Sequence, residues 1–358
     1  MKKVILFAIP MSICNFRCHY CYLSQRDAHI KGIQPLMKYS PEQVARAMSI
    51  ERIGGPTLMN FCADGETLLT KDLDKYIYLL VKEGHYAEIV TNLSYNPMLD
   101  SILAWDKELL AKVEFKCSFH YLELKRLGLL QRFSDNVHKI WEAGASANIE
   151  LTPSDELIPF IEELKTFCMA QFGALPQLTI ARNDKTSSID YLTSLSMEEY
   201  DRIWGQFDSN FWRFKKELFG VKRKEFCYAG AWSLYIDLTT GQCKQCYIGQ
   251  ALGDAFAHPE KPLPSLPIGC CRLPHCYNGH ALLSCGLIPD LNTPGYGDLR
   301  DRTCADGGHW LQPDLREFFD TKLVDSNKPI SGLSQFIYKN LYRPGRMLRK
   351  IKKRLHFK

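Results

Sequence analysis

Short apolar runs alternate with longer segments of mixed polarity through the first half of the chain. Apolar runs of this length, bounded by turn residues, are typical of buried strands. We predict six strands, at residues 3–10, 56–62, 88–91, 113–119, 147–151 and 177–181. The segments between them carry apolar residues at helical spacing, as in a helix over 72–83 with Leu73, Ile77, Leu80 and Val81 on one face.

Capping residues indicate where further helices begin and end. Ser40-Pro41-Glu42-Gln43 has an N-cap serine, a proline in the first turn and a capping-box glutamine. Ser196-Met197-Glu198-Glu199 is a second capping box, and we expect its helix to run to about residue 220. Two more predicted helices, each closed by a glycine, cover residues 133–143 and 157–172.

Strands that alternate with helices predict an α/β fold of parallel βαβ units. The crossovers of such units are right-handed, so the sheet should curl towards a barrel. Functional residues of parallel barrels lie at the carboxyl ends of the strands. Polar residues at these strand ends should therefore share one mouth, namely Thr91, Asn92, Ser118, His120, Glu150 and Arg182.

Three closely spaced cysteines, Cys14, Cys18 and Cys21, directly follow the first predicted strand. Thiolates are the usual protein ligands of iron–sulfur clusters, and short spacing lets one loop hold one cluster. A four-iron cubane normally takes four cysteines, so three leave one iron open to a small molecule. The spacing, with an aromatic residue at Tyr20, resembles the signature of the radical S-adenosylmethionine (SAM) enzymes.

This resemblance implies a partial (β/α)6 barrel and a cluster whose open iron takes the amino and carboxylate groups of SAM. It implies that an electron from the cluster cleaves SAM to a 5′-deoxyadenosyl radical. Asp64-Gly65-Glu66 stands where the family has Gly-Gly-Glu, a segment that holds the amino group of SAM. By the same resemblance the cofactor-binding residues are Tyr20, Gly65, Glu66, Asn92, Ser118 and Glu150.

Two other interpretations of the cysteine motif remain open. One is a zinc site completed by His19 or a distant residue, because short cysteine spacings also occur in zinc sites. The other is a lipoprotein signal, since basic residues and an apolar stretch precede Cys14. Pro10 interrupts that stretch, and bulky Ile13 stands where a signal needs a small residue.

A second group of cysteines lies between residues 226 and 304, in a stretch rich in Gly and Pro. Such a stretch should build little hydrophobic core, so a metal or cluster is expected to hold it together. Its opening segments resemble the auxiliary-cluster regions called SPASM or twitch domains. The ligands that this resemblance implies for a second 4Fe–4S cluster are Cys227, Cys246, Cys271 and Cys276.

The remaining cysteines have other expected roles. A further cluster or spare thiols would account for Cys243, Cys270, Cys285 and Cys304. Cys62, Cys117 and Cys168 fall inside predicted elements and are expected to be buried thiols. A structural zinc ion is the alternative for the second group, because zinc also takes four thiolates.

Length and charge suggest how the chain is divided. Its 358 residues suit one large enzyme domain with an appendage, or two domains. We predict a radical SAM core over 1–185, a helical bridge over 186–225, a cysteine-rich auxiliary-cluster region over 226–312 and a basic tail over 313–358. The tail has no acidic residue after Asp325, and an amphipathic basic helix there would suit a membrane surface, although a solvated tail is an equal alternative.

These patterns predict a cytoplasmic radical SAM enzyme, peripheral to the inner face of the membrane if the tail binds there. The expected substrate is a small molecule or glycan, in particular a cell-surface carbohydrate precursor, and the expected reductant is a flavodoxin or ferredoxin. The alternatives are a SPASM-type enzyme that modifies peptides or proteins, and a non-enzymatic iron–sulfur or zinc protein. Nucleic acid is not an expected partner, because the core lacks a basic, aromatic-laced segment. The sequence assigns no catalytic residue.

Overall fold

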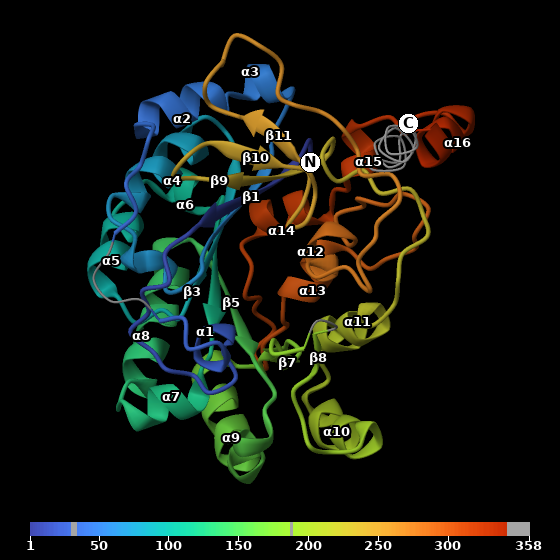
Figure 1. The fold of residues 1–358 in the computed structure, drawn as a ribbon. Coiled ribbons are helices and arrows are strands. Elements are labelled where there is room, and N and C mark those ends of the chain that lie inside the picture. Colours follow the sequence, from blue (N-terminus) through green and yellow to red (C-terminus); the bar gives the residue numbers. More distant parts are fainter. Residues whose placement is uncertain (30–33, 187–188, 342–358) are drawn as a thin grey trace.

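The computed structural model describes residues 1–29, 34–186 and 189–341. Figure 1 shows one sheet flanked by helices, with the C-terminal part of the chain packed against the other side of the sheet. Within the described residues, no helix is long and apolar enough to cross a bilayer. The prediction of an amphipathic basic tail falls largely on residues 342–358, which lie outside the described residues.

Six consecutive parallel strands form the centre of the fold, in the order in which they occur along the chain. They are β1 (Val4–Ile9), β2 (Leu58–Ala63), β3 (Tyr86–Thr91), β4 (Val113–Ser118), β5 (Ser146–Leu151) and β6 (Gln177–Leu178). Helices connect them, as the alternating pattern predicts, and the partial (β/α)6 barrel is confirmed. The sixth strand is shorter than predicted, because only its first two residues pair with β5.

The connecting helices bury their apolar faces on the outer face of the sheet, in one core with Ile5, Phe61 and Phe115. These elements are α1 (Tyr22–Gln25), α2 (Pro41–Ala47), α3 (Ile50–Ile53), η1 (Thr67–Leu69), α4 (Leu73–Lys82), α5 (Asn96–Leu103), α6 (Lys107–Leu110), α7 (Tyr121–Arg126), α8 (Leu130–Ala143), η2 (Asp155–Phe160) and α9 (Ile161–Phe172). The predicted capping box at Ser40 is present, with the Ser40 side chain accepting from the Gln43 N–H.

The single helix predicted from Ser196 to about residue 220 is wrong. The chain forms α10 (Met197–Trp204), η3 (Gly205–Phe207) and α11 (Asn210–Leu218). Asp208 adopts a left-handed conformation with φ of 47°, which ends the first helical run, and the Ser209 side chain caps α11 through the Trp212 N–H. A short hairpin of β7 (Arg182–Asn183) and β8 (Asp190–Tyr191) precedes α10.

The cysteine-rich region extends the same sheet, which the sequence does not predict. β9 (Ser233–Asp237) pairs in parallel with β1, and β10 (Gln242–Lys244) and β11 (Ala251–Asp254) continue the sheet in antiparallel pairing. The later helices are α12 (Gly279–Leu282), α13 (Tyr296–Arg300), α14 (Pro313–Asp320), α15 (Leu323–Ser326) and α16 (Gly332–Leu341).

These later elements form a second hydrophobic core against the inner face of the sheet. Val4 and Leu6 of β1 and Leu58 of β2 pack there with aromatic residues of the C-terminal part, such as Trp232 and Phe319. The expectation that this region builds little core is therefore wrong. Its apolar residues pack against the barrel and against one another, as Tyr228 does with Trp232, although they follow no local period in the sequence.

Candidate active site

The three cysteines of the N-terminal motif lie in one loop between β1 and α1, at the carboxyl end of β1. Asn92, which follows β3, holds this loop from the side. Its side-chain amide donates to Asn15 Oδ1 at 2.9 Å and lies 3.9 Å from Cys14 Sγ. The loop thus occupies the strand end where parallel barrels place their chemistry.

The loop thiols are crowded together and shielded from water. Burial, with smaller contributions from the charges of Glu66 and Cys21, raises the pKa of Cys14 to about 11. Burial also raises the pKa of Cys18, with further contributions from Cys21 and Cys14. A bound metal reverses such shifts, because its positive charge favours the thiolates.

The thiols of Cys14, Cys18 and Cys21 could each bind a separate iron of a four-iron cluster, because the cysteine ligands of such a cluster do not share one metal atom. Among residues 1–29, 34–186 and 189–341, no group of three or more His, Cys, Asp or Glu side chains is placed to hold a single metal ion.

Gly65 and Glu66 fasten the cysteine loop to the end of β2. The Gly65 N–H donates to the Met11 carbonyl at 2.7 Å, and the Glu66 N–H donates to the Ile13 carbonyl at 2.9 Å. A Cβ atom on Gly65 would lie 2.1 Å from the Ile13 oxygen, so any other residue forces the two segments apart. This close approach gives a physical reason for glycine at the position that the motif predicts.

The Glu66 carboxylate is buried and already satisfied. It accepts from Thr91 Oγ1 at 2.6 Å, from the Asn92 N–H at 2.7 Å and from the Leu68 N–H at 3.0 Å. The side chain is 2% exposed. This carboxylate thus ties β2 to β3, which leaves the backbone of the segment as its free hydrogen-bonding surface, and the prediction that Glu66 binds SAM stays a prediction.

Replacing Gly65 by alanine should disrupt the cysteine loop. The new methyl group meets the Ile13 carbonyl, a backbone atom that can move only with the loop. We expect the variant to lose about four irons per chain after anaerobic reconstitution, measured as iron and acid-labile sulfide. Gly205→Ala is the matched control, because an added Cβ there meets nothing within 4 Å. Equal iron in both variants would contradict this role of Gly65.

Tyr20 and Ser118 lie near the same mouth. The Tyr20 hydroxyl is 2.7 Å from His120 Nδ1. Burial lowers the pKa of His120 to about 4, so the ring is neutral and can accept that proton. Ser118, the last residue of β4, is in register with Glu150 on β5. Their predicted contacts with SAM stay predictions.

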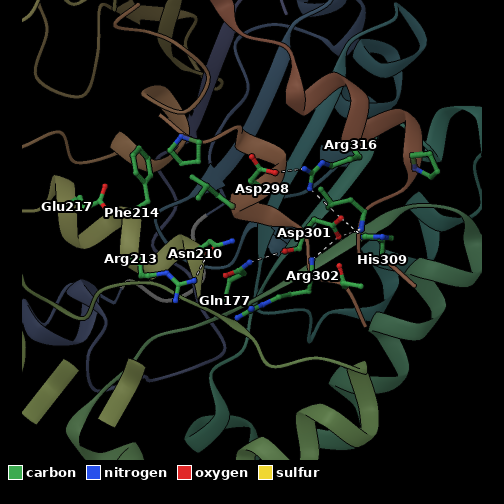
Figure 2. A pocket seen from close by; sticks show the side chains of 15 residues that line it. Gln177, Asn210, Arg213, Phe214, Glu217, Asp298, Asp301, Arg302, His309 and Arg316 are labelled. Atoms are coloured by element: carbon green, nitrogen blue, oxygen red, sulfur yellow. Dashed lines mark hydrogen bonds and ion pairs between the residues drawn. The ribbon is translucent and has the colours of Figure 1, made fainter. Parts of the chain in front are cut away.

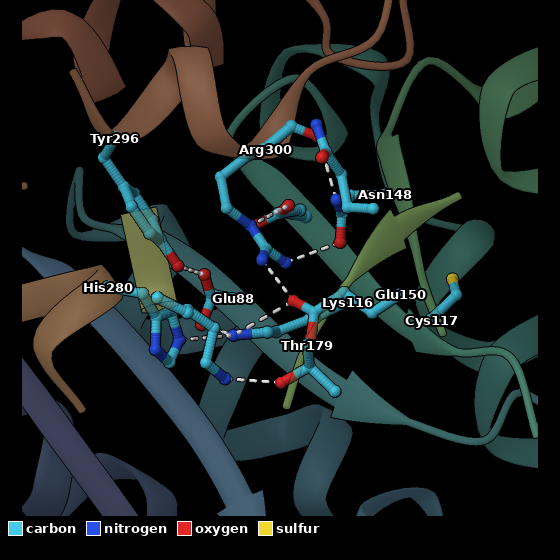
Figure 3. Close-up of polar contacts among 12 residues, drawn as sticks. Glu88, Lys116, Cys117, Asn148, Glu150, Thr179, His280, Tyr296 and Arg300 are labelled. Carbon is cyan, nitrogen blue, oxygen red and sulfur yellow. Dashed lines mark hydrogen bonds and ion pairs between the residues drawn. The ribbon is translucent and has the colours of Figure 1, made fainter. Parts of the chain in front are cut away.

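A network of charged side chains fills the inner face of the barrel (Figure 3). Adjacent strands β3, β4 and β5 present Glu88, Glu114 and Glu150. Lys116 Nζ lies 3.8 Å from Glu88 and 3.4 Å from Glu150. Arg300 of α13 pairs with both Glu114, at 3.2 Å, and Glu150.

The network sets the charge of Glu150. Burial alone would raise its pKa, but Arg300 and Lys116 hold the pKa at about 2. Glu150 is thus an ionised partner of Arg300. If it also binds SAM, as predicted, its carboxylate must contact SAM while it pairs with Arg300 and Lys116. Sequence analysis missed Arg300 and Lys116, although polar residues at every second strand position (88, 114, 116, 148 and 150) were a signal of a polar inner face.

The structure brings together the four cysteines predicted to hold a second cluster. Cys227 pairs with Gly269 through backbone hydrogen bonds, and the Cys276 carbonyl accepts from the N–H of Gly279, the first residue of α12. Burial raises the pKa of Cys276 well above normal, and the thiols of Cys227, Cys246 and Cys271 raise it further. Their assignment as ligands stays a prediction.

Other cysteines lie apart from this group. Cys243 packs in the core of the barrel, and Cys304 Sγ lies 3.5 Å from the Phe172 carbonyl. Cys117 and Cys168 are buried as predicted, but Cys62 is exposed, so that prediction is wrong. Successive strand residues face opposite sides, and Cys62 shares the inner face with Asn60, which donates to Glu88.

A pocket with a volume of about 1010 Å³ lies away from this mouth. Figure 2 shows its lining side chains, among them Gln177 at the start of β6. It therefore lies near the amino ends of the strands, away from the cysteine loop. Several of its charged groups pair with one another, such as Arg316 with Asp298 at 2.5 Å and His309 with Asp301 at 2.8 Å.

The chain matches no family model and no curated protein. Its structure matches three radical SAM enzymes over 71–73% of its length. SuiB of Streptococcus suis has a TM-score of 0.45 and 15% identity, and the match spans 64% of SuiB, less than two thirds of it. For anSMEcpe with bound AdoMet the TM-score is 0.49, with 15% identity and 76% of that chain covered. For BtrN in complex with AdoMet and 2-DOIA the values are 0.31, 13% and 78%.

Proposed function

We propose that the chain is a radical SAM enzyme with one auxiliary 4Fe–4S cluster. The observation that carries this proposal is the loop of Cys14, Cys18 and Cys21 at the carboxyl end of β1, fastened by the close backbone approach of Gly65. Three thiolates in that place suit a cluster with one open iron. When bound there, such a cluster supplies the electron that cleaves SAM to a 5′-deoxyadenosyl radical.

The residues of the chain orient the reactants and keep water away from them. Asn92 and Gly65 fix the loop, so that its three thiols stay at the mouth. Tyr20, Ser118 and the backbone at Gly65–Glu66 are our candidates for contacts with SAM. The C-terminal elements close over the inner face of the barrel and limit solvent access to the reaction, as radical chemistry requires.

The substrate that we favour is a polar small molecule, such as a cell-surface carbohydrate precursor. The polar inner face of the barrel, with Glu88, Lys116 and Arg300, supports this choice over an apolar substrate. Modification of a peptide is the second candidate, and the grouping of Cys227, Cys246, Cys271 and Cys276 favours it through the resemblance to SPASM regions. We further propose a cytoplasmic location, a flavodoxin or ferredoxin as electron donor and membrane contact through the basic tail.

Reductive cleavage of SAM tests the proposal. The anaerobically reconstituted full chain should convert SAM to 5′-deoxyadenosine when dithionite is added, as measured by liquid chromatography. An iron-loaded protein that forms none would favour a non-enzymatic iron–sulfur protein.

A further inference from the structure

A small cavity of about 20 Å³ lies between the end of β6, helix α11 and the segment that carries Cys276. Four basic residues line it, Arg182, Lys215, His275 and His280, and no Asp or Glu lines it. Such a volume admits one water-sized group, so it suits the end of a molecule rather than a whole substrate.

His280 presents a buried donor that has no partner. Its Nε2 atom lies 3.4 Å from Lys116 Nζ, and an ammonium group can only donate, so Nε2 accepts and the ring proton is on Nδ1. Nδ1 is buried and makes no hydrogen bond with the described residues. Leaving a buried donor unpaired costs about 1–3 kcal/mol, so an acceptor brought by a ligand would be stabilised there.

His275 repeats this feature on the same cavity. Its side chain is buried, and its Nε2 atom has no hydrogen-bond partner among the described residues. Contacts with Phe219 and Tyr277, at ring-centroid distances of 4.5 and 4.9 Å, fix the orientation of the ring. Two fixed imidazole rings thus present unused nitrogen atoms.

Lys215 and Arg182 are the cations at the cavity, because burial lowers the pKa of His280 well below its usual value and keeps that ring neutral. Burial lowers the pKa of Lys215 to about 7, so a bound anion would favour its charged form. Lys215 donates to Thr179, and neither Lys215 nor Arg182 forms an ion pair within the part of the chain that the structure describes. The negative charge of Glu150 raises the pKa of Lys215, but the Glu150 carboxylate forms its ion pairs with Arg300 and Lys116. The negative charge of Asp190 raises the pKa of His275.

We propose that this cavity binds an oxyanion, a carboxylate or a phosphate, that belongs to the substrate. Unpaired ring nitrogens with a lysine and an arginine match the acceptor oxygens and the charge of such a group. Cys276 lines the same cavity, so the anion lies beside the second cysteine group. That the anion is part of a substrate rests on the proposed function, whereas binding of the anion itself does not. If both hold, the substrate of the enzyme carries a carboxylate or a phosphate.

Equilibrium dialysis of the full chain tests this site without any turnover. The probes are radiolabelled inorganic phosphate and acetate, at constant ionic strength in chloride. We expect one of them to bind at one site per chain, and the tighter probe identifies phosphate or carboxylate as the group. Arg182→Gln and Lys215→Met should each weaken that binding by about tenfold or more, as expected for loss of a charge-assisted hydrogen bond.

His309→Gln is the matched control, because His309 is an exposed basic residue of the larger pocket. It should leave the dissociation constant unchanged. Arg182 is only half-buried, so its variant should fold even where Lys215→Met does not. If neither anion binds, or if Arg182→Gln binds as tightly as the wild-type chain, the site does not exist, whatever the SAM cleavage assay shows.

Discussion

Replacing Cys14, Cys18 and Cys21 together by alanine should abolish reductive cleavage of SAM. The three thiols form one group at the end of β1, and their loop contacts Asn92 and Gly65 rather than the second cysteine group. The variant therefore loses the proposed reactive site but keeps Cys227, Cys246, Cys271 and Cys276. We expect 5′-deoxyadenosine to fall to background under dithionite.

Cys304→Ser is the control for this experiment. Cys304 lies beside Phe172 and apart from both cysteine groups, so its variant should cleave SAM at the wild-type rate. Residual cleavage by the triple alanine variant, at more than background, would show that the N-terminal loop is not the reactive site.

Replacing Arg300 by methionine should strongly destabilise the fold. Arg300 is fully buried, and its guanidinium group pairs with Glu114 and Glu150 and donates to Asn148 Oδ1 at 2.5 Å. Removing it leaves buried carboxylates without their partner, which costs about 3–5 kcal/mol in the free energy of unfolding. Chemical denaturation followed by circular dichroism measures this loss.

Arg316→Met provides the comparison. Arg316 also pairs with several carboxylates, but its side chain is 30% exposed and water screens the pairs. We expect a loss of about 1 kcal/mol or less there. Equal losses in the two variants would mean that the inner network contributes no more than a surface ion pair.

The barrel was predictable because its strands are short apolar runs whose outward-facing residues form one core, and because helical patterns separate them. The strands β9 to β11 were missed, because they are short and lie among Cys, Gly and Pro residues that give no period. The break at Asp208 was missed as well, although Asp tolerates the left-handed region and Ser209 is a typical N-cap residue, so a local signal was present. The first failure concerns structure that tertiary packing determines, and the second concerns a capping signal within a helical pattern.

In the candidate site, too, some features were predictable and others were not. Spacing within one loop indicated the grouping of Cys14, Cys18 and Cys21, and the resemblance to SPASM regions indicated the grouping of Cys227, Cys246, Cys271 and Cys276. The burial of Glu66 and the exposure of Cys62 depend on which strand lies opposite, which one sequence does not reveal. Arg300 reaches Glu150 from 150 residues away, so its part in the network appears only in the folded chain.

The most direct measurement is the iron and acid-labile sulfide content of the full chain after anaerobic reconstitution. We predict about eight irons per chain for the wild type, because each of two cysteine groups would hold one four-iron cluster. The triple variant of Cys14, Cys18 and Cys21 should retain about four, and so should a variant without Cys227, Cys246, Cys271 and Cys276. Zinc in place of iron in the wild-type chain, or the same iron content in all three proteins, would contradict the account.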